Sequence, residues 1–362
     1  MPRPKAPSRP RFRWGSIRAR LRTWLERIVV LSAIAYPACL VVIAFALALI
    51  GEGWWVTTLG LYLPQFGFAL PLPFLAAALW LLRLKRLLLV QVVSLVTLLF
   101  LVGFVMPFPV RANEGALRLR VLSFNVDSGY AGYDKIAAKI SEHSPDVVLI
   151  QEAFHAPESL AELLKKHYAN VEYSTQFVIA SRFPILARTD PDRLPYLGRQ
   201  RSPRFMRYVI ATSLGALAFY NVHPASPRGV LRVYRVRYAL HMLRTGELFS
   251  GDPESDVEAN AGLRLLQVQA IAGLADVEPR PVVIAGDFNL PSLSPALRRN
   301  LSRYRDGFRS AGWGLGYTFP SKHPWMRLDR VLTSDSLRVT NFEVGCEGLS
   351  DHRCVVAELE RR

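Results

Sequence analysis

The feature that most constrains this chain is an uncharged apolar run over residues 28–50. A helix rises about 1.5 Å per residue, so a run of this length is enough to cross the roughly 30 Å hydrocarbon layer of a bilayer. Residues 59–82 and 87–106 are also free of charge. The middle run contains three prolines, which a membrane helix tolerates when neighbouring helices satisfy the freed backbone groups. We therefore expect three transmembrane helices.

The basic residues predict how these helices are oriented. The chain has a formal charge of +16 at pH 7, and Arg and Lys are concentrated in residues 1–27 and in the short RLKR segment over residues 83–86. Basic loops stay on the cytoplasmic side of a membrane. Both segments should therefore be cytoplasmic, which puts the C-terminal part on the outer side of the cell (inner or plasma) membrane. The alternative, a signal peptide cleaved near residues 46–48, leaves the C-terminal part on the same side.

Composition thus divides the chain into parts in different environments. The membrane region is followed by a short segment rich in proline, and no long uncharged run recurs beyond it. The expected parts are a basic cytoplasmic tail (1–27), a three-helix transmembrane region (28–106), a linker (107–116) and a catalytic domain (117–362).

The three cysteines are too few and too widely spaced for a zinc site or a disulfide scaffold. Any metal should therefore be a hard ion held by oxygen. Cys346 and Cys354 lie in a domain expected to face an oxidising compartment, where they would either form a disulfide or remain two reduced thiols.

Short apolar runs alternate with helical patterns in the C-terminal part. Helical spacing occurs over residues 133–143, 158–167 and 262–275, with Asn260 as the expected N-cap of the last helix. Residues 188–260 are the least regular, and we expect two long loops around a strand pair there. Many strands with interspersed helices favour an α+β layered sandwich. The expected strands are 117–126, 146–151, 176–181, 205–212, 216–222, 282–285, 327–333, 337–344 and 354–360.

Six of these apolar runs end in polar groups able to bind a metal ion or a phosphate. Any one alone is more typical of a turn or a helix cap. Strand ends at one edge of a sheet converge, so six in sequence order predict a common cleft. The six are Asn125 with Asp127, Gln151 with Glu152, Asn221 with His223, Asp287 with Asn289, Asp329 with Arg330, and Asp351 with His352.

These residue types suit phosphoester chemistry. Mg²⁺ prefers oxygen ligands and keeps several waters, so Glu152 and the amide oxygen of Asn125 suffice to hold it against a substrate phosphate; Mn²⁺ would fit as well. Asp287 is placed to orient or deprotonate the attacking water, and Asn289 to donate a hydrogen bond to the phosphate. Since alternate strand residues share a face, Asp287 and Asn289 should lie on the same side.

The ordered motifs FNVD, QE, SRFP, NVH, GDFN, LDRV and SDH resemble those of the endonuclease/exonuclease/phosphatase (DNase I-like) superfamily over residues 117–360. The resemblance, to a membrane-anchored bacterial member, implies a four-layered α/β sandwich and Mg²⁺-dependent phosphoester hydrolysis at the sheet edge. It also implies that Asp329 fixes the tautomer of His352 and that His223 protonates the leaving oxygen or contacts the phosphate.

Three further residues complete the expected site. Asp127 fits an acidic position present in some members of the superfamily and would be an auxiliary metal ligand. Asp351 would point away from His352 along an extended segment and reach the metal side. Arg330 follows Asp329 and is a candidate ligand of the substrate phosphate.

The expected substrate is an anionic phosphate compound. The short link after the last apolar run would keep the site near the membrane, which favours a lipid-linked phosphate, pyrophosphate or phosphodiester. The alternative is a membrane-bound endonuclease or exonuclease acting on DNA or RNA, with arginines between residues 199 and 237 as a basic track. A non-catalytic module would have lost part of the motif set, whereas Glu152, Asp287, Asn289 and His352 are all present.

Overall fold

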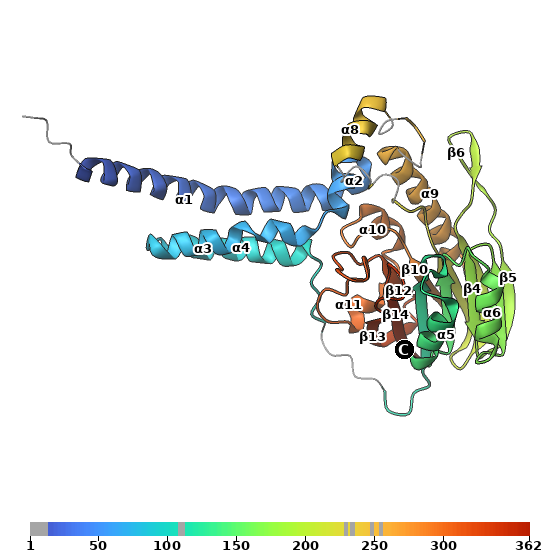
Figure 1. Ribbon diagram of the computed structural model, residues 1–362. Helices are drawn as coiled ribbons and strands as arrows, with labels where there is room; N and C mark the ends of the chain where they lie inside the picture. The colour runs from blue at the N-terminus through green and yellow to red at the C-terminus, as the bar shows by residue number, and fades with distance from the viewer. Residues whose placement is uncertain (1–13, 108–112, 228–230, 232–235, 247–249, 253–255) are drawn as a thin grey trace, which may run out of the picture. The chain divides into compact units, whose positions relative to one another are not determined.

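The computed structural model divides into two compact units. One comprises Met1–Ala44 and Phe66–Phe100, and the other comprises Phe45–Gln65 and Leu101–Arg362. Residues 1–13 of the expected basic tail and residues 108–112 of the expected linker lie outside the described residues (Figure 1). The structure describes residues 14–107, 113–227, 231, 236–246, 250–252 and 256–362.

The N-terminal part is helical, but it does not contain the three expected transmembrane helices. Residues Arg20–Gly53 form one helix that is long and apolar enough to cross a membrane. The second expected span is broken, because Trp55–Tyr62 and Gln65–Leu81 meet at 88° where a proline interrupts the chain. The third, α4 (Lys85–Leu101), has 17 residues and begins on a charged side chain. By length and composition the described residues thus offer one span, or two if the bent pair counts as one.

These N-terminal helices have the following bounds. The long first helix changes from α-helical to π-helical geometry near its C-terminal end, and a short 3-10 turn follows it. The elements are α1 (Trp14–Phe45), η1 (Ala46–Ile50), η2 (Gly51–Gly53), α2 (Trp55–Tyr62), η3 (Gln65–Ala69), α3 (Pro71–Leu81) and α4.

The C-terminal part is built on two six-stranded sheets. The first has the order β13-β14-β1-β2-β4-β3, with β1 and β2 parallel and the other pairs antiparallel. Its strands are β1 (Leu119–Asn125), β2 (Val147–Gln151), β3 (Asn170–Ser174), β4 (Phe177–Ser181), β13 (Leu337–Gly345) and β14 (Cys354–Arg361).

The second sheet repeats this plan, with the order β11-β12-β10-β9-β8-β5 and one parallel pair, β9 with β10. A small hairpin of β6 (Leu194–Tyr196) and β7 (Arg199–Arg201) stands apart. The strands of the second sheet are β5 (Ile185–Thr189), β8 (Phe205–Thr212), β9 (Gly215–Val222), β10 (Val282–Asp287), β11 (Arg305–Asp306) and β12 (Asp329–Thr333).

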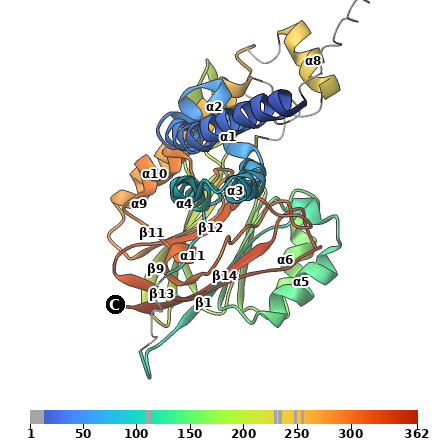
Figure 2. The same ribbon diagram turned by 90° about the vertical axis from the view of Figure 1, so that its left-hand side faces the viewer.

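Helices cover the outer faces of the two packed sheets, as Figure 2 shows. An apolar core of residues from both sheets fills the space between them. A second core joins the first sheet to α5 (Tyr133–Glu142) and α6 (Pro157–Lys165), and a third joins the second sheet to α9 (Val257–Asp276) and α10 (Pro295–Leu301). The four-layered α/β sandwich implied by the resemblance is thus confirmed. Two further helices are α8 (Val236–Thr245) and α11 (Gly307–Ala311).

Strand alternation decides which polar side chains meet between the sheets. In β10, Val283 and Ala285 belong to the core between the sheets, so Asp287 shares their face. In β1 the same rule places Asn125 on the face of Val121. Polar residues at the ends of buried strands are thereby directed to one edge of the space between the two sheets.

The expected strands agree with the observed ones, apart from shifts of a few residues at their ends. Helix α9 is longer than expected, because its N-cap is Asp256 and not Asn260: an Asp256 carboxylate oxygen accepts hydrogen bonds from the backbone N–H groups of Glu258 and Ala259. The region 188–260 contains more regular structure than the two loops expected, namely the β6–β7 hairpin and α8. Strands β3 and β5 were not predicted either.

Candidate active site

The expected site residues meet where strands of both sheets end. In the described residues, ligand atoms of Glu152, His223 and Asp287 lie within 4.8 Å of one another, and so do those of Asp287, Asp329 and His352. All five side chains are buried, and Asp287 belongs to both groups. Residues distant in sequence therefore form one continuous cluster around a single carboxylate.

Asp287 is the centre of this cluster. Its Oδ2 atom accepts a hydrogen bond from Nδ2 of Asn125 at 3.1 Å and lies 3.6 Å from Nε2 of both His223 and His352. Its Oδ1 atom accepts the backbone N–H of Asn289 at 2.8 Å. The carboxylate is thus fixed in orientation, with two imidazoles facing one of its oxygens.

His352 is oriented by a buried carboxylate. Its Nδ1 atom lies 2.8 Å from Oδ2 of Asp329, and the hydroxyl of Thr318 accepts the N–H groups of Leu328 and Asp329, which positions that strand end. Burial alone would lower the pKa of His352, but the charges of Asp329 and Asp287 outweigh burial and raise the pKa to about 10. The imidazole therefore carries a proton at neutral pH and can donate from Nε2 to an oxyanion.

His223 is held in the same manner by a neutral group. Its Nδ1 atom lies 2.5 Å from the amide oxygen of Gln176, so Nδ1 carries the hydrogen of this bond. Nε2 then faces the carboxylates, 3.1 Å from Oε1 of Glu152 and 3.6 Å from Oδ2 of Asp287. Gln176 was not among the site residues expected from the sequence. The one feature that could have indicated it is its position directly before β4.

The backbone at the site is strained. Asp127, Glu152 and Asn289 have φ angles of 43°, 56° and 51°, in the left-handed region that non-glycine residues seldom adopt. At Gly286 (φ 152°), an added Cβ would lie 2.0 Å from the carbonyl oxygen of Val222. Only glycine fits directly before Asp287, which explains the first letter of the GDFN motif.

Asp287 and Asn289 do not share a strand face as expected. Strand β10 ends at Asp287, and the left-handed conformation of Asn289 turns the chain away from the strand geometry that the alternation rule assumes. The Asn289 side chain nevertheless lines the cavity beside Asp287, and its Nδ2 atom donates to the carbonyl oxygen of Pro224 at 3.1 Å.

The donor set fits a hard divalent cation. Glu152 and Asp287 offer carboxylate oxygens, and Asn125 offers an amide oxygen that accepts the N–H of Asp127 at 3.1 Å. Nε2 of His223 is buried and lies 3.1 Å from Oε1 of Glu152, but it makes no hydrogen bond to any residue that the structure describes. A buried nitrogen without a hydrogen bond is costly, so the cluster is suited to a ligand that completes it.

Two of the expected metal ligands lie apart from these groups. Asp127 and Asp351 belong to no group of three such side chains among the described residues, and both are partly exposed. The carbonyl oxygen of Asp351 accepts the N–H of Ser321 at 2.7 Å, which fixes the loop before His352. A direct role of these two carboxylates in metal binding stays a prediction.

Arg330 is not directed toward the cluster. In β12, Val331 belongs to the core between the sheets and Leu332 to the helix-side core, so Asp329 faces the first and Arg330 the second. The Arg330 guanidinium pairs with Asp306 at 3.0 Å. The structure therefore corrects the expected contact of Arg330 with the substrate phosphate at this site, because neighbouring strand residues point to opposite faces.

Tyr62 completes the wall of the cavity. Its hydroxyl donates to the carbonyl oxygen of Asn289 at 2.8 Å and accepts from Nη1 of Arg264 at 3.0 Å. The sequence placed Tyr62 in a membrane helix, but Phe45–Gln65 belongs to the same unit as the C-terminal sandwich. No local pattern signals a contact over such a sequence separation. The same cavity is also lined by the apolar residues Pro227, Phe319, Met326 and Leu328.

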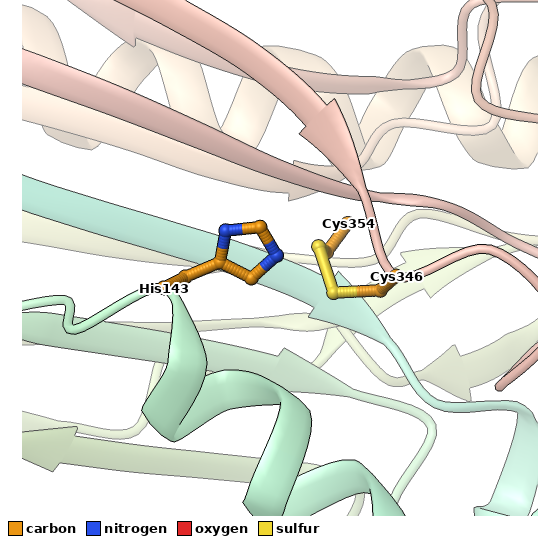
Figure 3. A group of neighbouring side chains, drawn as sticks. All are labelled: His143, Cys346 and Cys354. Atoms are coloured by element: carbon orange, nitrogen blue, oxygen red, sulfur yellow. A yellow bond between two sulfur atoms is a disulfide. The ribbon is translucent and has the colours of Figure 1, made fainter.

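Cys346 and Cys354 form a disulfide, which resolves the alternative left open by the sequence. Figure 3 shows His143 beside the two sulfur atoms. A disulfide has no thiolate to offer, so this trio is not a metal site. The bridge closes the loop that carries Asp351 and His352 and ties it to β14.

Comparisons with known proteins agree with this geometry. Residues 122–352 match the model of the Endonuclease/Exonuclease/phosphatase family, and the chain belongs to this family, whose members are hydrolases acting on phosphoester bonds. No curated protein matches the chain.

Three solved structures are similar to this chain. SmcL has a TM-score of 0.50 at 15% identity, with 67% of this chain and 99% of that chain covered. At this identity the likeness to SmcL shows the fold alone. An endonuclease/exonuclease/phosphatase from Beutenbergia cavernae has a TM-score of 0.49 at 19% identity, with 67% of this chain and 72% of that chain covered. Sphingomyelinase C from Streptomyces griseocarneus has a TM-score of 0.47 at 17% identity, with 67% of this chain and 99% of that chain covered.

Proposed function

We propose that this protein is a membrane-attached, divalent-metal-dependent phosphoester hydrolase. The observation that carries the proposal is the cluster of Glu152, His223, Asp287, Asp329 and His352, in which two buried groups share one carboxylate. Acidic and imidazole groups at this spacing suit the hydrolysis of a phosphate ester, since they can orient water and move protons around a developing negative charge.

The cation would be held by Glu152 with help from Asn125, and Mg²⁺ or Mn²⁺ suits these oxygen ligands. When bound, it would polarise the phosphoryl oxygen and offset negative charge. Auxiliary ligation by Asp127 and Asp351 remains part of the proposal.

The chain's own residues divide the remaining work. Asp287 orients the attacking water through Oδ2, which already faces two imidazoles at 3.6 Å. His352, protonated and held by Asp329, donates from Nε2 to a phosphoryl oxygen. His223, in its doubly protonated form, gives its Nε2 proton to the leaving oxygen, and Asn289 contributes to the phosphate contact from the cavity wall.

A lipid-linked substrate at the outer face of the membrane is the favoured choice. The helix Arg20–Gly53 supports attachment, and the basic segments support an extracytoplasmic catalytic domain. Tyr62 in the cavity wall comes from the segment that directly follows the long helix, so the site is built close to the point where that helix ends.

A substrate panel tests the reaction. The full chain in detergent is incubated with a polyprenyl pyrophosphate, sphingomyelin or plasmid DNA, each with Mg²⁺, with Mn²⁺ or with chelator. We expect metal-dependent release of phosphate or of a headgroup from a lipid and no nicking of DNA. Nicking of DNA without lipid turnover would replace the lipid substrate with nucleic acid, and equal turnover in chelator would refute the metal requirement.

Protease added to intact cells tests the orientation. We expect digestion of the C-terminal domain from outside, with a cytoplasmic marker protein left intact. Full protection of the domain in intact cells, and digestion only after lysis, would refute the proposed topology.

A further inference from the structure

A second cavity lies on the helix side of the second sheet. It is lined by residues of α10, α11 and β12, and none of its lining residues lines the cavity of the active site. Because Arg330 and Asp329 point to opposite faces of β12, the two cavities lie on opposite sides of that strand. Its polar lining residues include Ser292, Arg298, Asp306, Arg309 and Arg330.

The charges around this cavity are unbalanced. Asp306 is the shared acceptor of two buried arginines: Nη1 of Arg327 lies 2.7 Å from Oδ1, and Nη1 of Arg330 lies 3.0 Å from Oδ2. Arg298 and Arg309 add two more cations at the lining. No carboxylate pairs with the Arg309 guanidinium in the described part of the chain. Among the described residues that line the cavity, Asp306 is the single carboxylate and Arg298, Arg309 and Arg330 are three guanidinium groups, while the Glu52 carboxylate contacts the lining residue Ser294.

The surroundings of Arg330 are unfavourable for its positive charge. Its side chain is 1% exposed, and its Nε–H is buried with no hydrogen-bond partner among the described residues. Burial lowers the pKa of Arg330, and the charge of Arg327 lowers it further. A buried guanidinium under these conditions is stabilised by any additional anion nearby, since guanidinium groups bind phosphate oxygens through several parallel hydrogen bonds.

The cavity is open to such an anion. Arg298 and Arg309 are exposed, in contrast to Arg330. The hydroxyl of Ser292 lies 3.4 Å from Nη2 of Arg330 and offers a neutral donor within the same lining. Exposed cations next to a buried one can guide a phosphate group from solvent into the cavity.

The cavity also lies beside the end of the long N-terminal helix. Arg298 donates to the carbonyl oxygen of Ala48, and Arg299 donates to that of Leu49 at 2.9 Å. Glu52 accepts hydrogen bonds from the Ser294 hydroxyl and from a backbone N–H of α10. If that helix spans the membrane, as proposed above, α10 lies at the level of the lipid headgroups.

We propose that this cavity is a binding site for a phosphate group, distinct from the catalytic centre. A lipid headgroup or a free phosphate ion supplies the same chemistry, a tetrahedral oxyanion that accepts hydrogen bonds from Arg298, Arg309 and Arg330. The lipid source rests on the proposed membrane attachment, whereas the anion site itself does not.

Calorimetric titration of the full chain in neutral detergent tests the site, with chelator present so that no divalent ion contributes. The probes are inorganic phosphate, dihexanoyl phosphatidic acid and, as a chain control without phosphate, dihexanoylglycerol. We expect the two phosphate probes to bind and dihexanoylglycerol not to bind. Tighter binding of phosphatidic acid would identify the headgroup as the source, and equal binding would identify the phosphate ion; both outcomes support the site.

Matched variants locate the binding. R309Q combined with R298Q should weaken the phosphate probes at least tenfold, and R309K should retain most of the affinity. The control R199Q removes an exposed arginine of the β6–β7 hairpin and should leave binding unchanged. D287N should keep full affinity even where turnover is lost, which separates this site from the proposed catalytic one.

Several results would overturn the proposal. They are the absence of binding by the wild-type chain, an unchanged affinity in the folded double variant, an equal affinity for dihexanoylglycerol, or an equal loss of affinity in D287N. Unfolding temperatures of all variants, measured in the same detergent, show whether each protein is folded.

Discussion

Two carboxylates on either side of one sheet show how differently the same chemical group can be used. Asp329 faces the space between the sheets and meets one imidazole, His352, at 2.8 Å. Asp306 lies at the helix side and meets two guanidinium groups, those of Arg327 and Arg330. Both arginines keep their charge at neutral pH, whereas a histidine can exchange a proton. The face between the sheets is thus suited to proton transfer. The helix side holds fixed positive charges, which suit the anion binding proposed above.

The pKa shifts follow the same division. Burial by itself raises the pKa of Asp306, but Arg327 and Arg330 outweigh burial and hold it well below its ordinary value. At the other centre burial raises the pKa of Asp329, and the charges of Asp329 and Asp287 raise the pKa of the His352 imidazole despite its burial. One centre is locked in a single ionisation state, and the other holds a proton that a reacting oxygen can accept.

The largest effect should come from the carboxylate shared by both active-site groups. We expect D287N to lower turnover at least about a thousandfold, equivalent to about 4 kcal/mol of barrier, because water orientation and both imidazole contacts depend on Oδ2. Initial rates on the substrate identified by the panel give the measurement. D335N, at an exposed aspartate paired with Arg305, is the control and should retain full activity. Retained turnover in folded D287N would remove Asp287 from the mechanism.

The outer carboxylate should affect stability and not chemistry. D306N leaves two buried guanidinium groups without their anion, so we expect a loss of about 3–5 kcal/mol in the free energy of unfolding. Chemical denaturation at pH 7 measures it, and the folded fraction of the variant should keep its turnover. A loss of turnover with unchanged stability would reverse the division of roles between the two faces.

The depressed pKa of Asp306 also predicts how the free energy of unfolding changes with pH. A carboxyl whose pKa is lower in the folded state contributes stability above its unfolded value of about 3.9, and this contribution is lost as pH falls below that value. In acid titrations of unfolding, the wild-type chain should therefore lose more stability between pH 4 and pH 2 than D306N does. Parallel curves for the two proteins would contradict this assignment.

The inner carboxylate should show the opposite behaviour. D329N removes the anion that holds His352, so we expect a loss of about a hundredfold in turnover. Rates and unfolding curves on the same preparation separate the two effects: turnover should fall while most of the stability remains. D329N that is fully active would show that His352 needs no carboxylate partner.

Much of this site could be predicted from the sequence, because its information is local. A polar residue at the end of a buried strand is recognisable in a short window, and the strands of both sheets that meet at one edge bring such residues together. The alternation of side chains along a strand also predicts the position of Arg330. In β12 it puts Arg330 and Asp329 on opposite faces of the sheet. The same alternation does not predict the position of Asn289, because Asn289 has a left-handed backbone conformation and lies beyond the end of the strand.

The membrane region and the cavity wall could not be predicted in the same way. Hydropathy counts uncharged residues, but whether a run forms one straight helix depends on where the chain bends; the break between α2 and α3 at 88° divides the second run. The contact of Tyr62 with Asn289 depends on the packing of Phe45–Gln65 within the C-terminal unit. Long-range packing of this kind leaves no periodic signal in the sequence.

The smallest effect should come from the Tyr62 hydroxyl, which accepts a hydrogen bond from the Arg264 guanidinium. Arg264 differs from the arginines beside Asp306 in the partners of its hydrogen bonds. Arg264 is 1% exposed, and its hydrogen bonds go to neutral oxygens, among them the hydroxyl of Tyr62, which in turn donates to the carbonyl oxygen of Asn289. Y62F removes both bonds, and we expect a loss of about 1–2 kcal/mol in the free energy of unfolding. Because Asn289 lines the active-site cavity, turnover should also fall several-fold.

Y317F is the matched control for this prediction, since the Tyr317 hydroxyl donates to the carbonyl oxygen of Val102 at 2.8 Å and does not line that cavity. It should lose less stability than Y62F, because it removes one hydrogen bond and not two, and it should keep its turnover. If both variants lose turnover equally, the Tyr62 hydroxyl acts through general stability alone. If only Y62F loses turnover, the segment after the long helix positions Asn289, and the membrane-proximal part of the chain takes part in building the active site.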